Sequence, residues 1–188
     1  MRLIHEGTTH PTLDGPRDVA QHYLPELVYG ATDGIITTFA VVAGVEGAQL
    51  SPVVVLILGV ANLLADGVSM GASSFLSIRS QTAVEKMEEK PVTEPFAFRH
   101  GLATFLAFVV AGAVPLLGVI FSVTPEYRFP VTVVLTLLTL FAVGAARVFI
   151  TRGSWWKSGF EMMLVGALAA GIAYGVGAFL ADVMGISA

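Results

Sequence analysis

Five apolar runs, each close to the length of a membrane span, occupy most of this 188-residue chain. They cover residues 27–48, 52–78, 101–123, 130–150 and 159–184. A helix needs about 20 apolar residues to cross roughly 30 Å of hydrocarbon. A soluble domain of this size could not bury a chain that is 55% hydrophobic and 13% charged. The sequence therefore predicts an all-α membrane protein with five transmembrane helices.

Lys and Arg are distributed unequally between alternate loops. Basic residues near helix ends resist translocation and so collect on the cytoplasmic side. With the amino terminus in the cytoplasm, every Lys and Arg except Arg128 falls on the inner side, and five spans place the carboxyl terminus outside. The first residues do not resemble a targeting segment. We therefore expect a multi-pass protein of a prokaryotic inner membrane.

Two polar segments accompany the apolar runs. Residues 1–25 are expected to form a polar cytoplasmic leader, ahead of a five-helix transmembrane domain at 26–188. Residues 79–100 are expected to form a short cytoplasmic linker with about two helical turns before its prolines. Its acids could gather cations at the mouth of the bundle: Glu85, Glu88, Glu89 and Glu94. The alternative is a solvated linker whose charge is balanced by Lys86 and Lys90.

Two of the predicted spans carry polar side chains along one helix face. The face of the first span holds Glu26, Tyr29 or Gly30, Asp33 and Thr37, and the face of the second holds Asn62, Asp66, Ser69, Met70 and Ser73. A carboxylate near the middle of a spanning helix costs roughly 2.5–3.5 kcal/mol on insertion scales, so it should face a partner or a water-filled path. Alternatively, Asp33 and Asp66 are protonated or bonded to neighbouring helices and only hold the bundle together.

Met70 lies one helical turn from Asp66 on the same predicted face. A lone methionine in an apolar helix usually serves packing. A thioether beside carboxylates, however, combines one soft ligand with several hard ones. This mixture suits a transition metal such as Fe²⁺ better than Mg²⁺ or Ca²⁺, which prefer oxygen ligands only.

Other functional classes find little support in the sequence. His5 and His10 are one residue too far apart for the zinc-protease pattern HExxH, no Glu-x-x-His pair is present for a di-iron centre, and cysteine is absent. No nucleophile, base and orienting group can be assembled, so we do not expect an enzyme. The net charge of −4 gives no indication of nucleic-acid binding.

Small residues recur at a spacing of four in three of the predicted spans. Such pairs allow helices to approach closely in lipid, where the hydrophobic effect does not drive association. The spacing fits packing inside one bundle and packing between two chains equally well. The pairs are Gly30 with Gly34, Gly67 with Gly71, and Gly171 with Gly175.

Several segments resemble the vacuolar iron transporter family, which includes the yeast calcium-cross-complementer and nodulin-like types. They are ELVYGATDGIITTFAVVAGV, LILGVANLLADGVSMGASSFLS, LATFLAFVVAGAVPLL and RGSWWKSGFEMMLVGALAAGIAYGVG. The resemblance covers almost all of residues 26–177. It implies a five-helix protomer and a homodimer whose ion path runs between the two copies of the first span. It also implies exchange of Fe²⁺ or Mn²⁺ out of the cytoplasm against protons.

By motif position, the resemblance assigns the family's pore aspartate to Asp33 and its pore methionine to Met70, and makes Glu26 similar to an entry acid. The chain departs from the family in three places. Asn62 stands where members often have an acid, and Ser73-Ser74-Phe75 stands where they often have GEY. The long cytoplasmic metal-collecting domain of many members is reduced here to about twenty residues, too short to fold independently.

The leading hypothesis is a dimeric, proton-coupled exporter of divalent transition metal, Fe²⁺ first and Mn²⁺ second. Its metal ligands would be Asp33, Met70, Glu26 and Asn62, with Thr37 and water completing the shell. Competition between metal and proton at Asp33, with Asp66 as a second coupling residue, would link the two flows. The expected partners are the metal ion, protons, the lipid bilayer and a second copy of the chain, with no permanently bound cofactor. The alternative is a non-transporting membrane metal sensor or scaffold.

Overall fold

The computed structural model describes residues 19, 21–92, 96–122, 124–151 and 153–185. Most of the expected leader, with His5 and His10, lies outside the described residues, as does Glu94 of the acidic run. Every regular element within the described ranges is helical. Five helical segments are long and apolar enough to cross a membrane. The prediction of an all-α membrane protein with five spans is therefore confirmed.

The helices follow the predicted spans closely, with some shifted ends. They are α2 (Leu24–Gly47), α3 (Pro52–Met87), α4 (Ala97–Gly112), α5 (Val114–Phe121), the short 3-10 helix η1 (Pro125–Tyr127), α6 (Arg128–Thr151) and α7 (Trp155–Met184). The largest difference is in α3, whose 36 residues continue well past the predicted end of the second span. Residues 79–87 of the expected linker are thus part of α3.

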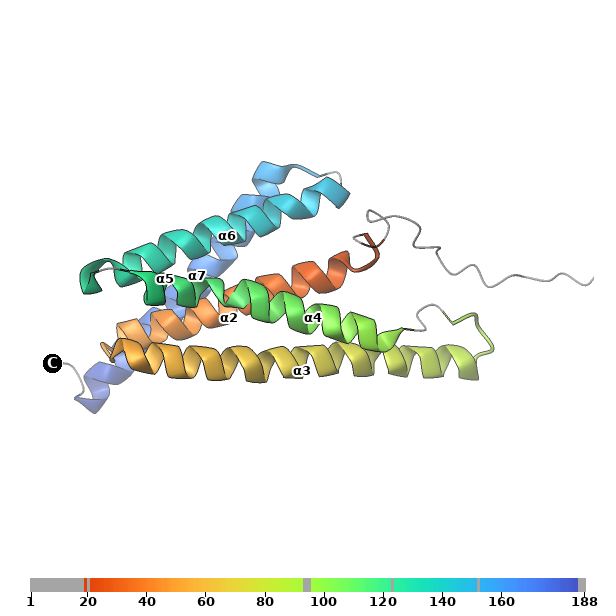
Figure 1. The fold of residues 1–188 in the computed structure, drawn as a ribbon, viewed down its shortest axis with the longest axis horizontal. Coiled ribbons are helices and arrows are strands. Elements are labelled where there is room, and N and C mark those ends of the chain that lie inside the picture. Colours follow the sequence, from red (N-terminus) through yellow and green to blue (C-terminus); the bar gives the residue numbers. More distant parts are fainter. Residues whose placement is uncertain (1–18, 20, 93–95, 123, 152, 186–188) are drawn as a thin grey trace, which may run out of the picture.

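Helix α2 lies at the centre of the bundle and contacts α3, α4, α6 and α7. Figure 1 shows α3 along one side of the bundle, α6 along the other, and α4 beside α2. Helices α2 and α4 run in the same direction, because both begin at the end of the bundle where α3 finishes. This arrangement places the starts of α2 and α4 next to each other and beside the last turns of α3.

The two ends of the bundle differ in charge. One end holds the starts of α2, α4 and α7 and the last turns of α3 and α6. We call it the basic end, because the described basic residues gather there: Arg79, Lys86, Lys90, Arg99, Arg147 and Lys157. Arg128 lies at the opposite end, at the start of α6.

Glycines let α2 and α4 touch at their backbones. A Cβ atom added at Gly30 would lie 2.6 Å from the carbonyl oxygen of Thr104, and one at Gly34 would collide with the carbonyl oxygen of Phe108. Gly71 packs in the same way against Gly101 of α4. These glycines therefore serve packing inside one chain.

The glycine pair of α7 behaves differently. Nothing lies within 4 Å of a Cβ atom added at Gly171 or Gly175. Their small faces point away from the rest of the chain, and they leave α7 with a surface that a lipid or a second copy could approach closely.

The third span is broken, which the sequence analysis did not predict. Helix α4 ends at Gly112 and α5 begins at Val114, with a turn at Ala113 between them. Pro115 stands in the first turn of α5. Because proline lacks a backbone N–H and its ring clashes with the carbonyl four residues earlier, a continuous helix cannot pass this position undisturbed.

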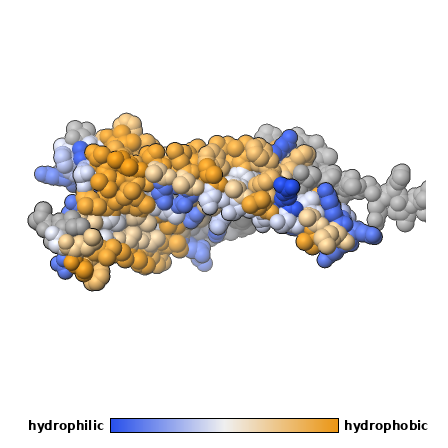
Figure 2. Space-filling model, turned by 90° about the horizontal axis from the view of Figure 1, so that it is seen from below, coloured by the Kyte–Doolittle hydropathy of each residue, from blue (hydrophilic) through white to orange (hydrophobic). Residues whose placement is uncertain are grey.

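Apolar side chains face outward along the bundle. They cover most of the face in Figure 2, where hydrophilic side chains interrupt them in the middle and gather toward the ends. Large apolar residues such as Val110 and Ile172 are about 70% exposed (70% and 69%). The buried core lies around α2 and includes Ile35, Phe39 and Phe108. An apolar exterior around a small core is what a bilayer requires.

Candidate functional site

The polar residues of α2 and α3 form one partly covered surface of the bundle. Glu26 and Asp33 on α2 are half-buried, whereas Tyr29 between them is 66% exposed. On α3, the half-buried members are Asn62, Asp66 and Met70, and the exposed ones are Ser69 and Ser73. We call this set of eight residues the polar face. Both helices position it through their 3.6-residue period, as the sequence predicted.

Two carboxylates of the polar face lie on the neighbouring helices α2 and α3, within range of each other's charge. Asp33 and Asp66 lie close enough for their negative charges to repel each other. A cation or a proton between such carboxylates removes the repulsion. The structure therefore brings together the two acids that the sequence placed on separate helices.

A hollow of about 440 Å³ opens near the basic end of the polar face. We call it the vestibule. Its polar lining comes from three helices: Glu26 and Tyr29 of α2, Ser73, Ser74 and Ser77 of α3, and Thr104 of α4. Met70 lines it as well. The vestibule thus unites two of the predicted metal ligands, Glu26 and Met70, from different helices.

Asp33 lies deeper in the bundle than the vestibule. It follows Glu26 by seven positions on α2, a distance of roughly 10 Å at 1.5 Å per residue. Thr37, one turn farther, donates its hydroxyl proton to the carbonyl oxygen of Asp33 at 2.8 Å, which leaves the hydroxyl lone pairs available. Asn62 lies one turn of α3 beyond Asp66. Polar atoms therefore continue along both helices away from the basic end.

The described residues of one chain do not supply a complete metal-binding cluster. No group of three or more His, Cys, Asp or Glu side chains is arranged to hold a metal ion in these parts of the structure. The Asp33–Asp66 pair is the acidic centre of the polar face. Any further ligands would have to be the Met70 thioether, amide or hydroxyl oxygens, water, or groups from a second copy.

Sequence reasoning missed one contact in the vestibule wall. Nδ1 of His100, in the first turn of α4, lies 2.8 Å from Oε1 of Glu26. The side chain of His100 is 4% exposed and that of Glu26 is 15% exposed. Only the topology could have suggested this contact, because the first and third spans of such a bundle begin at the same end.

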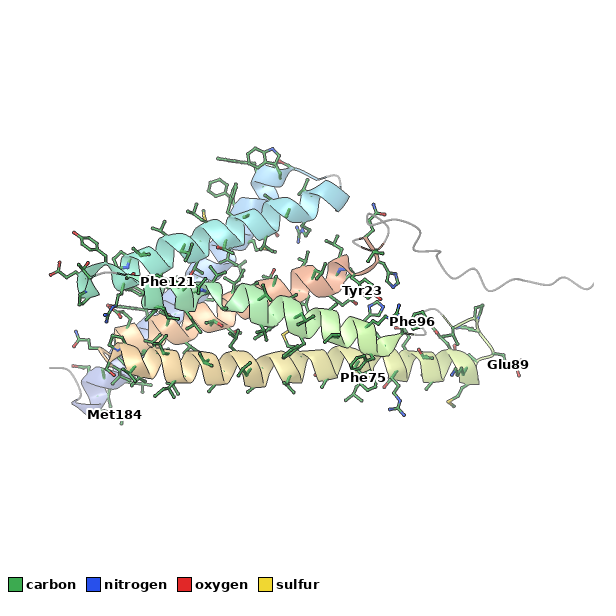
Figure 3. All side chains as sticks on the ribbon, viewed as in Figure 1. Tyr23, Phe75, Glu89, Phe96, Phe121 and Met184 are labelled. Atoms are coloured by element: carbon green, nitrogen blue, oxygen red, sulfur yellow. The ribbon has the colours of Figure 1, made fainter. Side chains whose placement is uncertain are left out.

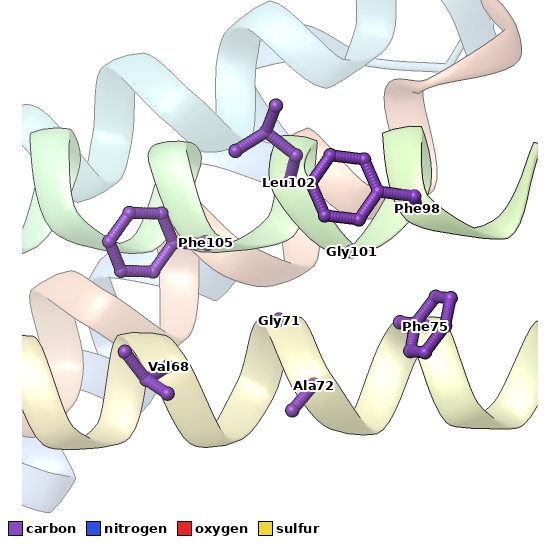
Figure 4. Close-up of a pocket in the computed structure, with 8 residues that line it drawn as sticks. All are labelled: Val68, Gly71, Ala72, Phe75, Phe98, Gly101, Leu102 and Phe105. Atoms are coloured by element: carbon purple, nitrogen blue, oxygen red, sulfur yellow. The ribbon is translucent and has the colours of Figure 1, made fainter.

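A second hollow, between α3 and α4, is apolar throughout. It encloses about 360 Å³ and is lined by side chains such as Val68, Phe75, Phe98 and Phe105. Figure 4 shows these side chains around the contact of Gly71 with Gly101. Without oxygen, nitrogen or sulfur ligands in its side chains, this groove is unsuited to a metal ion.

The predicted capture acids lie far along α3. Figure 3 shows Glu89 at the tip of the chain beyond α3, past the starts of α2 and α4, where Tyr23 and Phe96 are labelled. Glu88 forms an ion pair with Lys90 at 2.7 Å. Glu85 accepts a hydrogen bond from Gln81 at 3.2 Å. Glu88 and Glu89 are exposed and Glu85 is half-buried, so this surface is largely solvated and its charge is partly balanced.

Five membrane-length helices define a multi-pass integral membrane protein, and two of them carry acids at membrane depth. The model of the VIT family matches residues 24–94 and 87–178, which include most of the helical bundle. The chain belongs to the VIT family.

Curated relatives agree with this assignment. The chain is 31% identical to "Vacuolar iron transporter homolog 5" of Oryza sativa subsp. japonica, with 82% of this chain and 79% of the relative covered. It is 27% identical to "Vacuolar iron transporter" of Toxoplasma gondii, with 89% of this chain and 78% of the relative covered. These names describe transporters and not enzymes, in agreement with the expectation from the sequence.

Proposed function

We propose that this protein is a proton-coupled exporter of divalent transition metal, with Fe²⁺ as its first substrate and Mn²⁺ as its second. The observation that carries the proposal is the placement of two acids, Asp33 and Asp66, on adjacent membrane-spanning helices, within range of each other's charge. The names of the relatives support a metal as the substrate, because they are called vacuolar iron transporters.

The proposed metal ligands are Glu26 and Met70 at the vestibule and Asp33 and Asn62 deeper in the bundle. A divalent ion would enter beside Glu26 and then reach Asp33. The mixture of carboxylate, amide and thioether ligands suits Fe²⁺ and Mn²⁺ and selects against cations that require oxygen only. The hydroxyl groups of Ser73 and Thr37, on the same helix faces, would complete the shell together with water.

Proton coupling would follow from competition at the carboxylates. A carboxylate binds a cation or a proton but not both at once. The charge repulsion between Asp33 and Asp66 favours states in which a metal ion or a proton is bound to them. Release of metal would therefore be accompanied by proton uptake, so the two flows would run in opposite directions.

Part of the polar face is exposed in the single chain, and this exposure supports a homodimer. Tyr29 is 66% exposed, and Ser69 and Ser73 are exposed as well. Polar residues at membrane depth avoid lipid and face protein or water. A second copy packed with its own α2 against this face would enclose the polar residues, complete the ligand set and place the path between the two chains.

The proposed orientation has the basic end in the cytoplasm, following the distribution of Lys and Arg. The relatives are named as vacuolar proteins, whereas the sequence favoured a prokaryotic inner membrane. The proposed direction of transport, out of the cytoplasm, is the same for either membrane.

The test is uptake of Fe²⁺, and separately Mn²⁺, into liposomes that contain the purified protein under an imposed pH gradient. We expect metal flux that depends on the gradient and a matching flow of protons. Liposomes without protein provide the baseline. The absence of flux of both metals in liposomes that contain well-folded protein would contradict the proposal. It would favour a membrane metal sensor or scaffold.

Replacing Met70 with Leu is expected to lower Fe²⁺ uptake about tenfold and Mn²⁺ uptake less. Leucine has nearly the same volume, so the packing of this half-buried position is kept. Only the soft thioether is lost, and Fe²⁺ depends on soft ligands more than Mn²⁺ does. Initial rates of uptake of both metals measure the effect. Equal losses for the two metals would contradict a role of Met70 in selectivity.

Replacing Glu85, Glu88 and Glu89 together with Gln tests whether these acids near the end of α3 gather cations. We expect the KM for Fe²⁺ to rise about twofold at low ionic strength and to be unchanged in about 0.5 M salt, because screening removes attraction between exposed charges. The maximal rate should stay the same. A KM equal to that of the native protein at low ionic strength would show that the segment is only a solvated linker.

A further inference from the structure

His100 and Glu26 meet where α4 and α2 both begin, at the wall of the vestibule. Oε1 of Glu26 and Nδ1 of His100 are 2.8 Å apart. An ionised carboxylate can only accept a hydrogen bond, so the N–H at Nδ1 is the donor. The bond joins two helices that are far apart in the sequence.

The imidazole ring of His100 is itself held in place. Its side chain is 4% exposed, and its ring packs against those of His22 at 5.0 Å and Tyr23 at 4.8 Å between centroids. The ring is thus enclosed by the residues just before α2. Because the ring is held on several sides, the carboxylate that it binds is held as well.

The backbone contact between α2 and α4 fixes the axial position of His100 relative to Glu26. One turn beyond Glu26, Gly30 touches the backbone of Thr104, and one turn before Thr104 lies His100. The hydroxyl group of Thr104 donates to the carbonyl oxygen of His100 at 3.0 Å. The close backbone contact does not allow the helices to slide, so His100 and Glu26 remain opposite each other.

The second oxygen of Glu26 is left without a partner. Oε2 is buried and makes no hydrogen bond with any described residue, while the Glu26 side chain lines the vestibule. A buried carboxylate oxygen without a donor carries a free-energy cost. Oε2 lies below the accessible surface of the vestibule wall, so a cation would reach it when the groups that cover it move aside, and binding there would remove this cost.

We infer that His100 is a positioning residue that binds one oxygen of Glu26 and so leaves the other oxygen without a protein partner, available to metal that enters the vestibule. The inference rests on the proposed function and extends it, because it assigns the alignment of the entry acid to a residue of α4. His100 does not touch the metal in this arrangement. Its loss should weaken metal capture and leave the later transport steps nearly intact.

The test compares Fe²⁺ uptake by proteoliposomes of the native protein with that of His100→Leu and His100→Asn. Leucine removes the donor, whereas the amide nitrogen of asparagine is as far from Cα as Nδ1 is. We expect His100→Leu to raise the KM about tenfold, since loss of such a supporting partner typically costs about 10–100-fold in metal affinity. The maximal rate should stay within about twofold, and His100→Asn should restore a KM near the native value.

A double-mutant comparison separates positioning from simple packing. In a Glu26→Gln background, His100→Leu should cause no further rise in KM, because the group that it positions is gone. A packing role would instead lower the maximal rate in both His100 variants and add to the effect of Glu26→Gln, and this result would overturn the inference. If leucine prevents folding, His100→Gln, which moves the N–H one bond farther, should raise the KM in its place.

Binding of Fe²⁺ to the detergent-solubilised protein keeps the inference testable if transport fails. Absence of Asp33-dependent flux in the native protein would contradict the proposed function but not the role of His100. In that case, a Kd for Fe²⁺ about tenfold higher in His100→Leu supports the inference. Equal Kd values, or no binding to the native protein, overturn it.

Discussion

Replacing Asp33 with Asn should abolish metal transport. We expect uptake of both Fe²⁺ and Mn²⁺ into proteoliposomes to fall roughly 100-fold or more, since loss of a supporting residue alone already costs about 10–100-fold in metal sites. The amide has the size of the carboxylate but carries no negative charge and exchanges no proton. Proton flow driven by a metal gradient should disappear together with metal flux.

The matched control for Asp33→Asn is Asp182→Asn. Asp182 is an exposed aspartate in the last turn of α7, away from the polar face. Its replacement should leave both flows unchanged. Size-exclusion chromatography would verify that both variants elute as the native protein does. Metal flux that survives in Asp33→Asn with its pH dependence intact would refute the proposed mechanism.

Replacing Gly34 with Ala adds a single methyl group and is expected to destabilise the fold strongly. The added Cβ would collide with the carbonyl oxygen of Phe108, and a backbone atom in a helix cannot move aside. Overpacking of this kind costs about 1–3 kcal/mol, which corresponds to a decrease of roughly 2–12 °C in Tm for a chain of this size. Thermal unfolding in detergent measures the change.

The matched control for Gly34→Ala is Gly171→Ala. An added Cβ at Gly171 meets nothing within 4 Å, and alanine favours helix by about 0.5–1 kcal/mol over glycine. Its Tm should therefore be equal to or above that of the native protein. A similar decrease in both variants would mean that the α2–α4 contact is not the cause. Dissociation of a dimer in Gly171→Ala alone would indicate that this face of α7 packs between copies.

The number and position of the spans could be predicted because each depends on a local property of the chain. A run of about 20 apolar residues must be a helix in lipid, where every backbone polar group needs an internal partner. The polar face was predicted for the same reason, since the period of a helix places Asp33 in line with Glu26 and Asp66 in line with Met70.

The break of the third span and the length of α3 were harder to predict. Pro115 signals a disturbed helix, yet the apolar run continues on both sides of it, and hydropathy does not register the break. Residues 79–87 are polar, so hydropathy ended the second span before them, whereas the helix itself continues to Met87. Hydropathy reports where lipid begins and not where a helix ends.

The sequence by itself determined the five spans, the polar stripe on each of two spans and the family, because helical period and apolar length act within short stretches of chain. Only the tertiary structure decided which glycines pack inside the protomer, that Asp33 and Asp66 lie within range of each other's charge, and that His100 binds Glu26. These contacts join residues on different helices. Their distances depend on how the helices dock, and docking is set by side-chain and backbone fit across the whole bundle.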